Sequence, residues 1–514
     1  MELSEHIKTA NVEDVTLRRP FYPALRGTLC VTSHHLLFSN RKDEASWQLL
    51  ILLKNIDAIE KRAVGSSGTI TIKCKDLLVL QLEIPGMEEC LNIASSIEAL
   101  SSLESVTEMY PFFYRPSHLT LQGPWGLSST EQYYKQTERL WDRWRVSKVN
   151  SDYSVCPSYP SAVIVPREVD DDKLIRSARF RQGGRFPVLS YCHLRNGMVI
   201  MRSSQPLTGA NKKRCKEDEL LLQAVIDGSE LGYIIDLRSA QQAQQARMTG
   251  GGFESKSCYS HWKRIHRHHE RGKVVQESLI KLVEACSDLS HSVDRWLSKL
   301  ENSKWLSHVH SVLSTAGLVV ECVERDGHSV LVHGSEGTDN TLLVSSLAQL
   351  ILDPASRTVT GFLCLLEREW IQAGHPFQQR CAHSAHSHAR LKQECPSFLL
   401  LLDCVWQVWR QFPLALEFSE ALLLRLAQEV YASNYGTFLC NSEQERWRLR
   451  LVLWSRQYLN PLYEATDLAI WPSVHPQSLQ LWTGMFLRWT EYAQNMEEAR
   501  EEVWSIVKEH RERV

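Results

Sequence analysis

The sequence predicts a multidomain chain of mixed α+β and α/β class, in which a small β domain closed by a helix precedes a larger layered α/β domain. The chain has 514 residues, 43% apolar and 23% charged, an ordinary composition for roughly two to four globular domains. Short alternating apolar segments fill residues 1–100, whereas apolar strands alternate with longer helical segments from about residue 120. We place a connector at 101–122, the second domain at 123–490 and a C-terminal helix at 491–514.

The first 100 residues have the pattern of a sheet with one packed helix. Residues 27–32 and 35–39 predict two neighbouring strands, and residues 68–74 alternate β-branched with polar side chains. A Pro-Gly pair at 85–86 then breaks the pattern. The apolar residues that follow recur at helical spacing, as in an amphipathic helix on a sheet: Met87, Cys90, Leu91, Ile93, Ala94, Ile97 and Leu100.

The sequence pattern also predicts a packed connector and several elements of the second domain. Residues 110–116 are aromatic and bounded by proline, which indicates a packed connector rather than a loose linker. Residues 232–236 and 329–332 predict buried strands. The longest apolar run, 398–406, contains an acid and is far shorter than the about 20 residues of a membrane span, so it predicts a core helix. We expect no transmembrane segment.

The most informative stretch follows the strand at 329–332. Two glycines, Gly334 and Gly337, lie in a short loop, and the next apolar residues recur at helical spacing: Leu342, Leu343, Leu347, Leu350 and Ile351. A strand, a tight loop and a helix point successive backbone N–H groups into one concavity. The stretch therefore has the shape of a loop that holds a phosphate.

The side chains of this loop do not match its shape. Cleavage of a phosphate ester through a covalent intermediate needs a thiolate of low pKa at the start of the loop and a guanidinium at its end. Gly334 and Asn340 occupy these two positions. Glycine has no side chain that could attack, and an arginine in such a role can be worth roughly 10³ to 10⁵ in rate. We expect a phosphatase fold that has lost its activity.

This loop resembles the C-S-D-G-W-D-R loop of the myotubularins, which are cysteine-dependent phosphatases of 3-phosphorylated inositol lipids. Framework motifs similar to those of the family occur in its order over most of residues 120–490, at 181–191, 202–207, 250–253, 368–370 and 435–443. The resemblance implies a PH-like GRAM domain at 1–100, with a less specific match, and a cysteine-phosphatase-like α/β domain at 123–490.

Within the family the loop is most similar to that of the catalytically inactive branch. Gly334 takes the place of the nucleophile, Asn340 that of the arginine, Thr338 that of the tryptophan and Glu336 that of the first aspartate, while Asp339 keeps a carboxylate often assigned as general acid. Without a cysteine, Asp339 and Glu336 are expected to cap the following helix and bond loop amides. The degenerate phosphate loop comprises His333, Gly334, Ser335, Glu336, Gly337, Thr338, Asp339, Asn340 and Thr341.

A second phosphate contact is altered as well. Residues 375–380 resemble the His-Arg-Phe-Gln-x-Arg motif of active members, so that one lipid-phosphate arginine is replaced by Pro376 and Arg380 alone is kept. Two alternatives for Arg380 stay open at this point: a residual phosphate contact and a buried ion pair.

The resemblance implies a non-enzymatic regulatory subunit. Such a chain would pair with active myotubularins and enhance or target their dephosphorylation of phosphatidylinositol 3-phosphate and 3,5-bisphosphate. Two alternatives compete: an autonomous phosphoinositide-binding membrane module, and a weak 3-phosphatase with Ser335 or a water at Asp339 as nucleophile. A serine needs an adjacent base, and His333 is expected to turn away from the loop. No cofactor is implied.

Charge and targeting signals limit the binding partners and the cellular location that the sequence predicts. The net charge is −2 and the pI about 6.9, so nothing global favours nucleic acid or an anionic membrane. The basic segment 261–271 could attract a phosphoinositide surface, but a solvated helix face is the preferred interpretation. The N-terminus lacks a signal-peptide pattern. We expect a cytoplasmic protein peripherally associated with intracellular membranes, perinuclear, endoplasmic-reticulum or endosomal.

The cysteines and histidines do not predict a metal site. The 14 cysteines form no C-x-x-C pair, which favours reduced thiols in a reducing compartment. The cluster at 381–388 is rich in histidine, but no second ligand pair at finger spacing accompanies it. We expect an exposed polar loop there and no metal.

The chain ends in a short heptad stripe. Its apolar positions are Tyr492, Met496, Ala499, Val503 and Ile506. The stripe spans about two heptads, whereas a coiled coil is expected from about three or four. A seam for an active family partner, a homodimer and a helix packed on its own domain all stay open.

Overall fold

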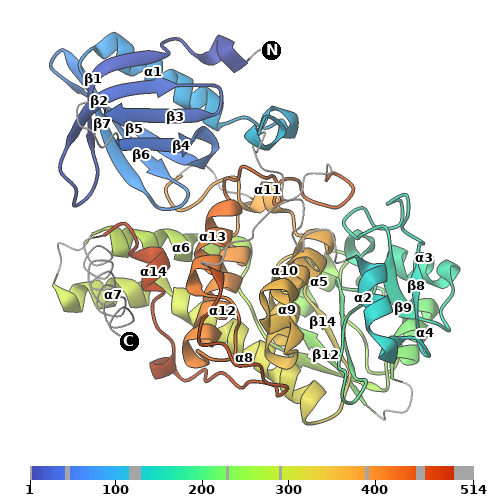
Figure 1. Ribbon diagram of the computed structural model, residues 1–514. Coiled ribbons are helices and arrows are strands. Elements are labelled where there is room, and N and C mark those ends of the chain that lie inside the picture. Colours follow the sequence, from blue (N-terminus) through green and yellow to red (C-terminus); the bar gives the residue numbers. More distant parts are fainter. Residues whose placement is uncertain are drawn as a thin grey trace.

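The computed structural model has an N-terminal β domain that sits against one end of a larger α/β domain (Figure 1). The structure describes residues 3–40, 47–114, 129–226, 231–288, 292–387, 393–446 and 458–490. The predicted heptad stripe at 491–514 therefore lies outside the described residues, as do the last two residues of the aromatic connector segment. The rest of that segment is packed, since Tyr110 lies edge-on to His35 with ring centroids 4.4 Å apart and Tyr114 lies against Tyr435.

The N-terminal domain is one antiparallel sheet of seven strands in the order β4-β3-β2-β1-β7-β6-β5. The strands are β1 Asn11–Arg18, β2 Leu25–Val31, β3 His35–Asn40, β4 Trp47–Leu52, β5 Ile56–Val64, β6 Ser67–Cys74 and β7 Val79–Ile84. Helix α1, Met87–Ser101, packs on β5 and β6 and buries Ile93, Ile97 and Leu100. The strands and the helix predicted for this region are confirmed.

A five-stranded sheet in the order β10-β11-β14-β12-β13 forms the centre of the second domain. Its strands are β10 Val188–Cys192, β11 Val199–Ser203, β12 Gly232–Asp236, β13 Trp262–His266 and β14 Val330–His333. All neighbours are parallel except β10 and β11. A separate antiparallel pair consists of β8 Trp144–Ser147 and β9 Val163–Pro166. The predicted strands at 232–236 and 329–332 correspond to β12 and β14.

Helices cover both faces of this sheet (Figure 1). The helices of this domain are α2 Thr130–Gln136, α3 Asp171–Phe180, α4 Lys216–Val225, α5 Ala240–Met248, α6 Gly272–Ser287, α7 Val293–Ser303, α8 Trp305–Glu324, α9 Asn340–Leu352, α10 Val359–Leu366, α11 Phe377–Arg380, α12 Ser397–Gln411, α13 Glu420–Glu429 and α14 Thr483–Phe486. A π-helical turn, η8 Glu367–Gln372, follows α10. Helix α12 contains the predicted core run and buries it completely.

The central strand β14 explains why both faces must be covered. Val330 and Val332 point into the cluster formed with α8, α9 and α12, whereas Leu331 points into the opposite cluster with α3, α4, β8 and β9. Side chains alternate between faces along a strand, so a run of apolar residues needs a core on each side.

Helix α8 has the length and apolar character of a membrane span. Half of its most apolar window is buried, and it packs against α6, α9 and α12. Core helices of globular domains pass the same test. Within the described part of the chain it is the one helix that does so.

The described part of the predicted exposed polar loop, 381–387, is not an exposed loop. Ser384, Ala385 and Ser387 are buried, and the backbone N–H groups of residues 384, 386 and 387 donate to the carboxylate of Asp57 at distances of 2.9–3.1 Å. Asp57 belongs to β5 of the N-terminal domain. The segment therefore joins the two domains, which no local pattern could indicate.

The basic segment at 261–271 is likewise not a solvated helix face. Residues 262–266 form β13 at the edge of the sheet, in parallel register with β12. Trp262 is buried on one face and donates its indole N–H to the carbonyl of Leu222, and Arg264 stacks 4.0 Å over the ring of Phe253. Basic side chains lie on both faces of this strand, so the apolar alternation that predicts a strand is absent from the sequence.

Candidate functional site

The degenerate loop lies at the carboxyl end of the central strand. Residues 334–339 connect β14 to α9, between the ends of β11 and β12. The carbonyl of His333 accepts a hydrogen bond from the N–H of Leu237, and that of Ser335 accepts one from the N–H of Gln205. The loop is therefore anchored at its neighbours on both sides. Crevices at the carboxyl ends of parallel strands are where ligands bind in open α/β sheets.

The backbone of the loop keeps the form of an anion cradle. Gly337 has a φ of +77°, and a Cβ there would lie 2.5 Å from the carbonyl oxygen of Ser203, so glycine is required. The guanidinium of Arg185 donates a hydrogen bond to the carbonyl of Gly337 at 2.7 Å. Within the described ranges, no protein oxygen accepts from the backbone N–H groups of residues 334–338. These donors are available to an anion.

Gly334 and Asn340 occupy the two positions where a covalent phosphatase mechanism needs a nucleophile and an arginine. A Cβ on Gly334 would have ordinary contacts only, 3.7 Å from Oγ1 of Thr341 and 3.9 Å from Leu237. The site thus has room for a side chain, and the buried hydroxyl of Thr341 has no hydrogen-bond partner within the part of the chain described. Asn340 is the first residue of α9, and its amide donates to the carbonyl of Glu270 at 3.2 Å. The Asn340 amide is therefore bonded to the segment that precedes α6.

Asp339 and Arg380 form a paired unit beside the cradle. The carboxylate of Asp339 accepts from Nε and Nη2 of Arg380, both at 2.9 Å, and the two side chains are 23% and 14% exposed. Of the two alternatives for Arg380, the structure shows the ion pair, and the phosphate contact stays a prediction. The expectation that Asp339 caps α9 is wrong, because its side chain makes no cap hydrogen bond and faces Arg380 instead. Glu336 is 68% exposed and lies 3.8 Å from Arg380.

Burial and pairing shift the pKa values of this unit. Burial alone would raise the pKa of the Asp339 carboxyl, but the hydrogen bonds from Arg380 and the nearby His375 hold it below its usual value. Burial lowers the pKa of His375 to about 4 despite the nearby carboxylate. The neutral imidazole donates from Nδ1 to the carbonyl of Thr338 at 2.8 Å. Asp339 is therefore an ionised acceptor, not a carboxylic acid with a proton to give.

Pro376 is the N-cap of the short helix α11, which ends with Arg380. The backbone N–H of Arg380 donates to the carbonyl of Pro376 at 2.9 Å, so the two residues lie one turn apart on one helix. An arginine at residue 376 would lie on the same side as Arg380. Proline supplies no donor there, and the one remaining guanidinium is already occupied by Asp339.

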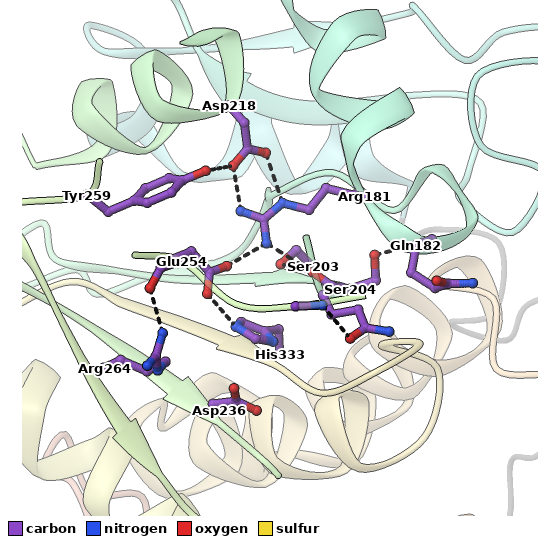
Figure 2. A network of polar contacts seen from close by, with 12 residues as sticks. Arg181, Gln182, Ser203, Ser204, Asp218, Asp236, Glu254, Tyr259, Arg264 and His333 are labelled. Carbon is purple, nitrogen blue, oxygen red and sulfur yellow. Dashed lines mark hydrogen bonds and ion pairs between the residues drawn. The ribbon is translucent and has the colours of Figure 1, made fainter. Parts of the chain in front are cut away.

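His333 points out of the loop and into a buried polar network (Figure 2). Its Nε2 lies 3.0 Å from a carboxylate oxygen of Glu254, and the other oxygen of Glu254 accepts from Arg181 at 2.6 Å. Arg181 also makes two hydrogen bonds with Asp218, at 2.9 and 2.6 Å. Tyr259 donates to Asp218 at 2.7 Å. The expectation that His333 turns away from Ser335 is confirmed.

This network sets the protonation of its members. Burial would raise the pKa of Glu254, but His333 and Arg181 lower it well below the usual range. Burial opposes the charge of Arg181 as well, yet Asp218 and Glu254 raise its pKa. The charged side chains and His333 are 0–1% exposed, and the network fixes the start of the loop to the segment that carries Arg181.

Two other arginines of the framework motifs also make ion pairs or hydrogen bonds inside the domain. Arg202 on β11 pairs with Glu369 at 3.0 Å, and Arg185 donates to Gly337 and to the carbonyl of Ala373. Sequence analysis did not find Asp218, Glu254 or Tyr259. Buried arginines signal that carboxylates must accompany them, but only the fold selects which ones.

Comparison with known proteins identifies both domains by family. Residues 109–447 match the model of the myotubularin-like phosphatase domain, and residues 11–101 match that of the GRAM domain of myotubularin-related proteins 6 to 9. The chain is 56% identical to mouse myotubularin-related protein 9 over 525 residues, covering 100% of the chain and 96% of the relative. It is 58% identical to bovine myotubularin-related protein 9-like over 523 residues, covering 99% and 96%.

A relative whose name states an activity is more distant. The chain is 34% identical to the human phosphatidylinositol-3-phosphate phosphatase MTMR7 over 531 residues, covering 98% of the chain and 80% of the relative. The N-terminal sheet with its helix is accordingly a PH-like GRAM domain, and the larger domain is of the myotubularin phosphatase type. The chain thus belongs to the myotubularin-related family.

Proposed function

We propose that this chain is a pseudophosphatase that serves as a regulatory subunit of active myotubularins. The observation that carries the proposal is the loop itself. It keeps the backbone of a phosphate cradle, has no nucleophile at Gly334, and has its one retained arginine paired with Asp339. Buried ion pairs keep the framework of the domain intact although the site lacks its reactive groups. An intact framework without catalysis supports a role in which the surface of the domain binds another protein.

The partner is proposed to be an active lipid phosphatase of the same family. A relative of this chain is named a phosphatidylinositol-3-phosphate phosphatase. We propose that the complex dephosphorylates phosphatidylinositol 3-phosphate and 3,5-bisphosphate faster, or at a more defined membrane, than the active subunit alone. The chain would then act at the cytoplasmic face of an intracellular membrane, endoplasmic-reticulum, perinuclear or endosomal, as a peripheral subunit.

Co-purification followed by a lipid-phosphatase assay tests this proposal. The active relative is assayed on vesicles with phosphatidylinositol 3-phosphate, alone and with an equimolar amount of this chain. We expect a stable complex and a several-fold higher rate. A matched control uses the chain without residues 491–514, which tests whether the heptad stripe is the seam. Absence of both a complex and a rate change would contradict the proposal.

One observation favours a second candidate, an autonomous phosphoinositide-binding module. The N–H groups of residues 334–338 remain available to an anion even without catalytic side chains. Flotation of the purified chain with vesicles separates the two candidates. Binding without a partner that is lost on deleting residues 1–100 assigns it to the GRAM domain, whereas binding that survives the deletion assigns it to the loop.

The enzyme alternative is tested on the same material. Phosphate release from phosphatidylinositol 3-phosphate by the pure chain is expected to stay at background, because His333, the nearest histidine in sequence to Ser335, is bonded to Glu254. Saturable release that Ser335→Ala abolishes would overturn the assignment as a pseudophosphatase.

A further inference from the structure

The two domains enclose a cavity of about 740 Å³ that is separate from the degenerate loop. Strand β5 and helix α1 of the GRAM domain line one side, and α11, α13 and the segment after α11 line the other. Cavities of this size hold drug-sized ligands, and domain interfaces are common places for them.

A buried lysine lines this cavity. Lys75 is 2% exposed and directly follows β6. Its backbone N–H donates to the carbonyl of Asn55, but among the residues that the structure describes no oxygen accepts from its side-chain amine. An ammonium group removed from water without a partner is costly, so the position calls for either a neutral amine or an anion that joins it.

One of the charged groups that face Lys75 is an anion, Asp57, which raises the pKa of the amine, but among the described residues Asp57 accepts no hydrogen bond from that amine. Asp57 accepts three backbone hydrogen bonds from the segment after α11, and Lys54 adds a further positive charge while it donates to the carbonyl of Leu103. The thiols of Cys74 and Cys381 complete the surroundings, and burial raises the pKa of both. Burial first, and then Lys54, lower the pKa of Lys75 to about 7.

The other carboxylates of the cavity have partners of their own or lie at its rim. Glu98 pairs with Lys61 at 2.8 Å, and Glu429 pairs with Arg425 and accepts from Ser433. Glu104 is exposed, and Glu394 accepts from a neighbouring backbone N–H. These carboxylates at the rim disfavour a ligand with several negative charges and tolerate one with a single charge.

We infer that the cavity between the domains is a binding site for an amphipathic monoanion, a carboxylate on an apolar body, with Lys75 as its charge partner. The apolar lining fits such a body: Ile59, Ile97, Met109, Pro111, Phe377 and Phe438. Because α11 separates this cavity from the degenerate loop and the lining comes from both domains, the bound ligand would also hold the two domains together.

Isothermal titration calorimetry on the full chain at pH 8 tests the inference with octanoate as the probe. Octanoate is expected to bind the unaltered chain, to bind Lys75→Met at least tenfold more weakly, and to bind Lys73→Met as it binds the unaltered chain. Lys73 is the matched control, because it lies two residues away on the surface of the same domain and pairs with Glu60. Octan-1-ol, which has no charge, is expected to bind the unaltered chain and Lys75→Met equally.

A second measurement does not depend on any variant. If octanoate pairs with the amine of Lys75, which is mostly neutral at pH 8, the complex takes up a proton, and the heat of binding changes with the ionisation enthalpy of the buffer. No octanoate binding, or binding with no proton uptake and no loss in Lys75→Met, would overturn the inference. Tighter binding of inositol 1,3-bisphosphate than of octanoate, lost in Lys75→Met, would overturn the monocarboxylate and identify a phosphate ligand instead.

Discussion

At the scale of single residues, one carboxylate decides what the retained arginine of the loop can bind. Asp339 occupies the guanidinium of Arg380 with two hydrogen bonds of 2.9 Å. A phosphate at the cradle would compete with this internal anion for the same donors. The loop can thus keep its backbone form while its side chains favour the ligand-free arrangement.

Replacing Asp339 with alanine is expected to increase the affinity of the chain for phosphate. The variant frees Arg380, and a hydrogen bond to a charged group is worth about 1.5–3 kcal/mol, which corresponds to roughly ten- to hundredfold in affinity. Titration with inositol 1,3-bisphosphate measures the effect. Glu336→Ala is the control, because that side chain is exposed and lies 3.8 Å from Arg380. Equal affinities in both variants would show that the ion pair does not compete with phosphate.

Restoring the nucleophile and the arginine together is expected to give little or no activity. Gly334→Cys with Asn340→Arg fits sterically at residue 334, where Thr341 would lie beside the new thiol. Arg380 would still be paired and Pro376 would still lack a donor, and residues that act as a unit do not recover piecemeal. Phosphate release from phosphatidylinositol 3-phosphate measures this. A rate near that of an active relative would mean that the outer contacts matter less than we argue.

At the scale of elements, buried ion pairs fix the base of the loop to its surroundings. Arg181 connects the end of α3 to Asp218 on α4 and to Glu254, and Glu254 reaches His333 at the end of β14 (Figure 2). Four segments far apart in sequence meet at this one network. Its members cannot be removed singly without leaving a buried charge.

Glu254→Gln is expected to destabilise the fold by about 3–5 kcal/mol, the usual cost of breaking a buried ion pair. The pKa of Glu254 is lowered from 4.5, so its contribution is present above about pH 4.5 and is lost as the pH falls toward the lower folded value. Urea unfolding at pH 7 and at pH 4 measures both effects. The difference between Glu254→Gln and the unaltered chain should shrink at the lower pH.

Glu217→Gln is the matched control for this network. Glu217 lies on α4 beside Asp218 but pairs with an arginine whose side chain is 65% exposed. Exposed ion pairs contribute about 0–1 kcal/mol. Equal unfolding midpoints for the two variants would contradict the role assigned to the buried network.

At the scale of the whole molecule, a side-chain carboxylate of the GRAM domain binds a backbone segment of the larger domain. Asp57 accepts hydrogen bonds from three backbone N–H groups of the segment 384–387. Burial raises the pKa of its carboxyl, but the side chain of His383, the backbone N–H of Ser384, the nearby Lys75 and the backbone N–H of His386 together lower it below its usual value. The GRAM domain therefore has a defined position on the larger domain. That position also closes the cavity at Lys75.

Asp57→Ala is expected to loosen this junction without unfolding either domain. Three N–H groups would lose their acceptor, at about 1–3 kcal/mol for each one that is buried and left unsatisfied. Hydrogen–deuterium exchange of the peptide that contains residues 384–387 should become at least tenfold faster. Glu83→Ala, at an exposed pair on the same sheet, should leave this peptide unchanged. Unchanged exchange in Asp57→Ala would show that the junction depends on other contacts.

Local sequence determined much of this protein. The apolar alternation of β14, the glycines of its loop and the stripe of α1 depend on residues near one another in the chain, so pattern alone indicated these elements and the absence of a thiol at Gly334. Only the tertiary structure decided that Arg380 is paired with Asp339, that residues 262–266 form an edge strand, and that residues 384–387 bind Asp57. Each of these depends on partners brought together from distant segments, and a buried charge or N–H group takes whichever partner the fold places beside it.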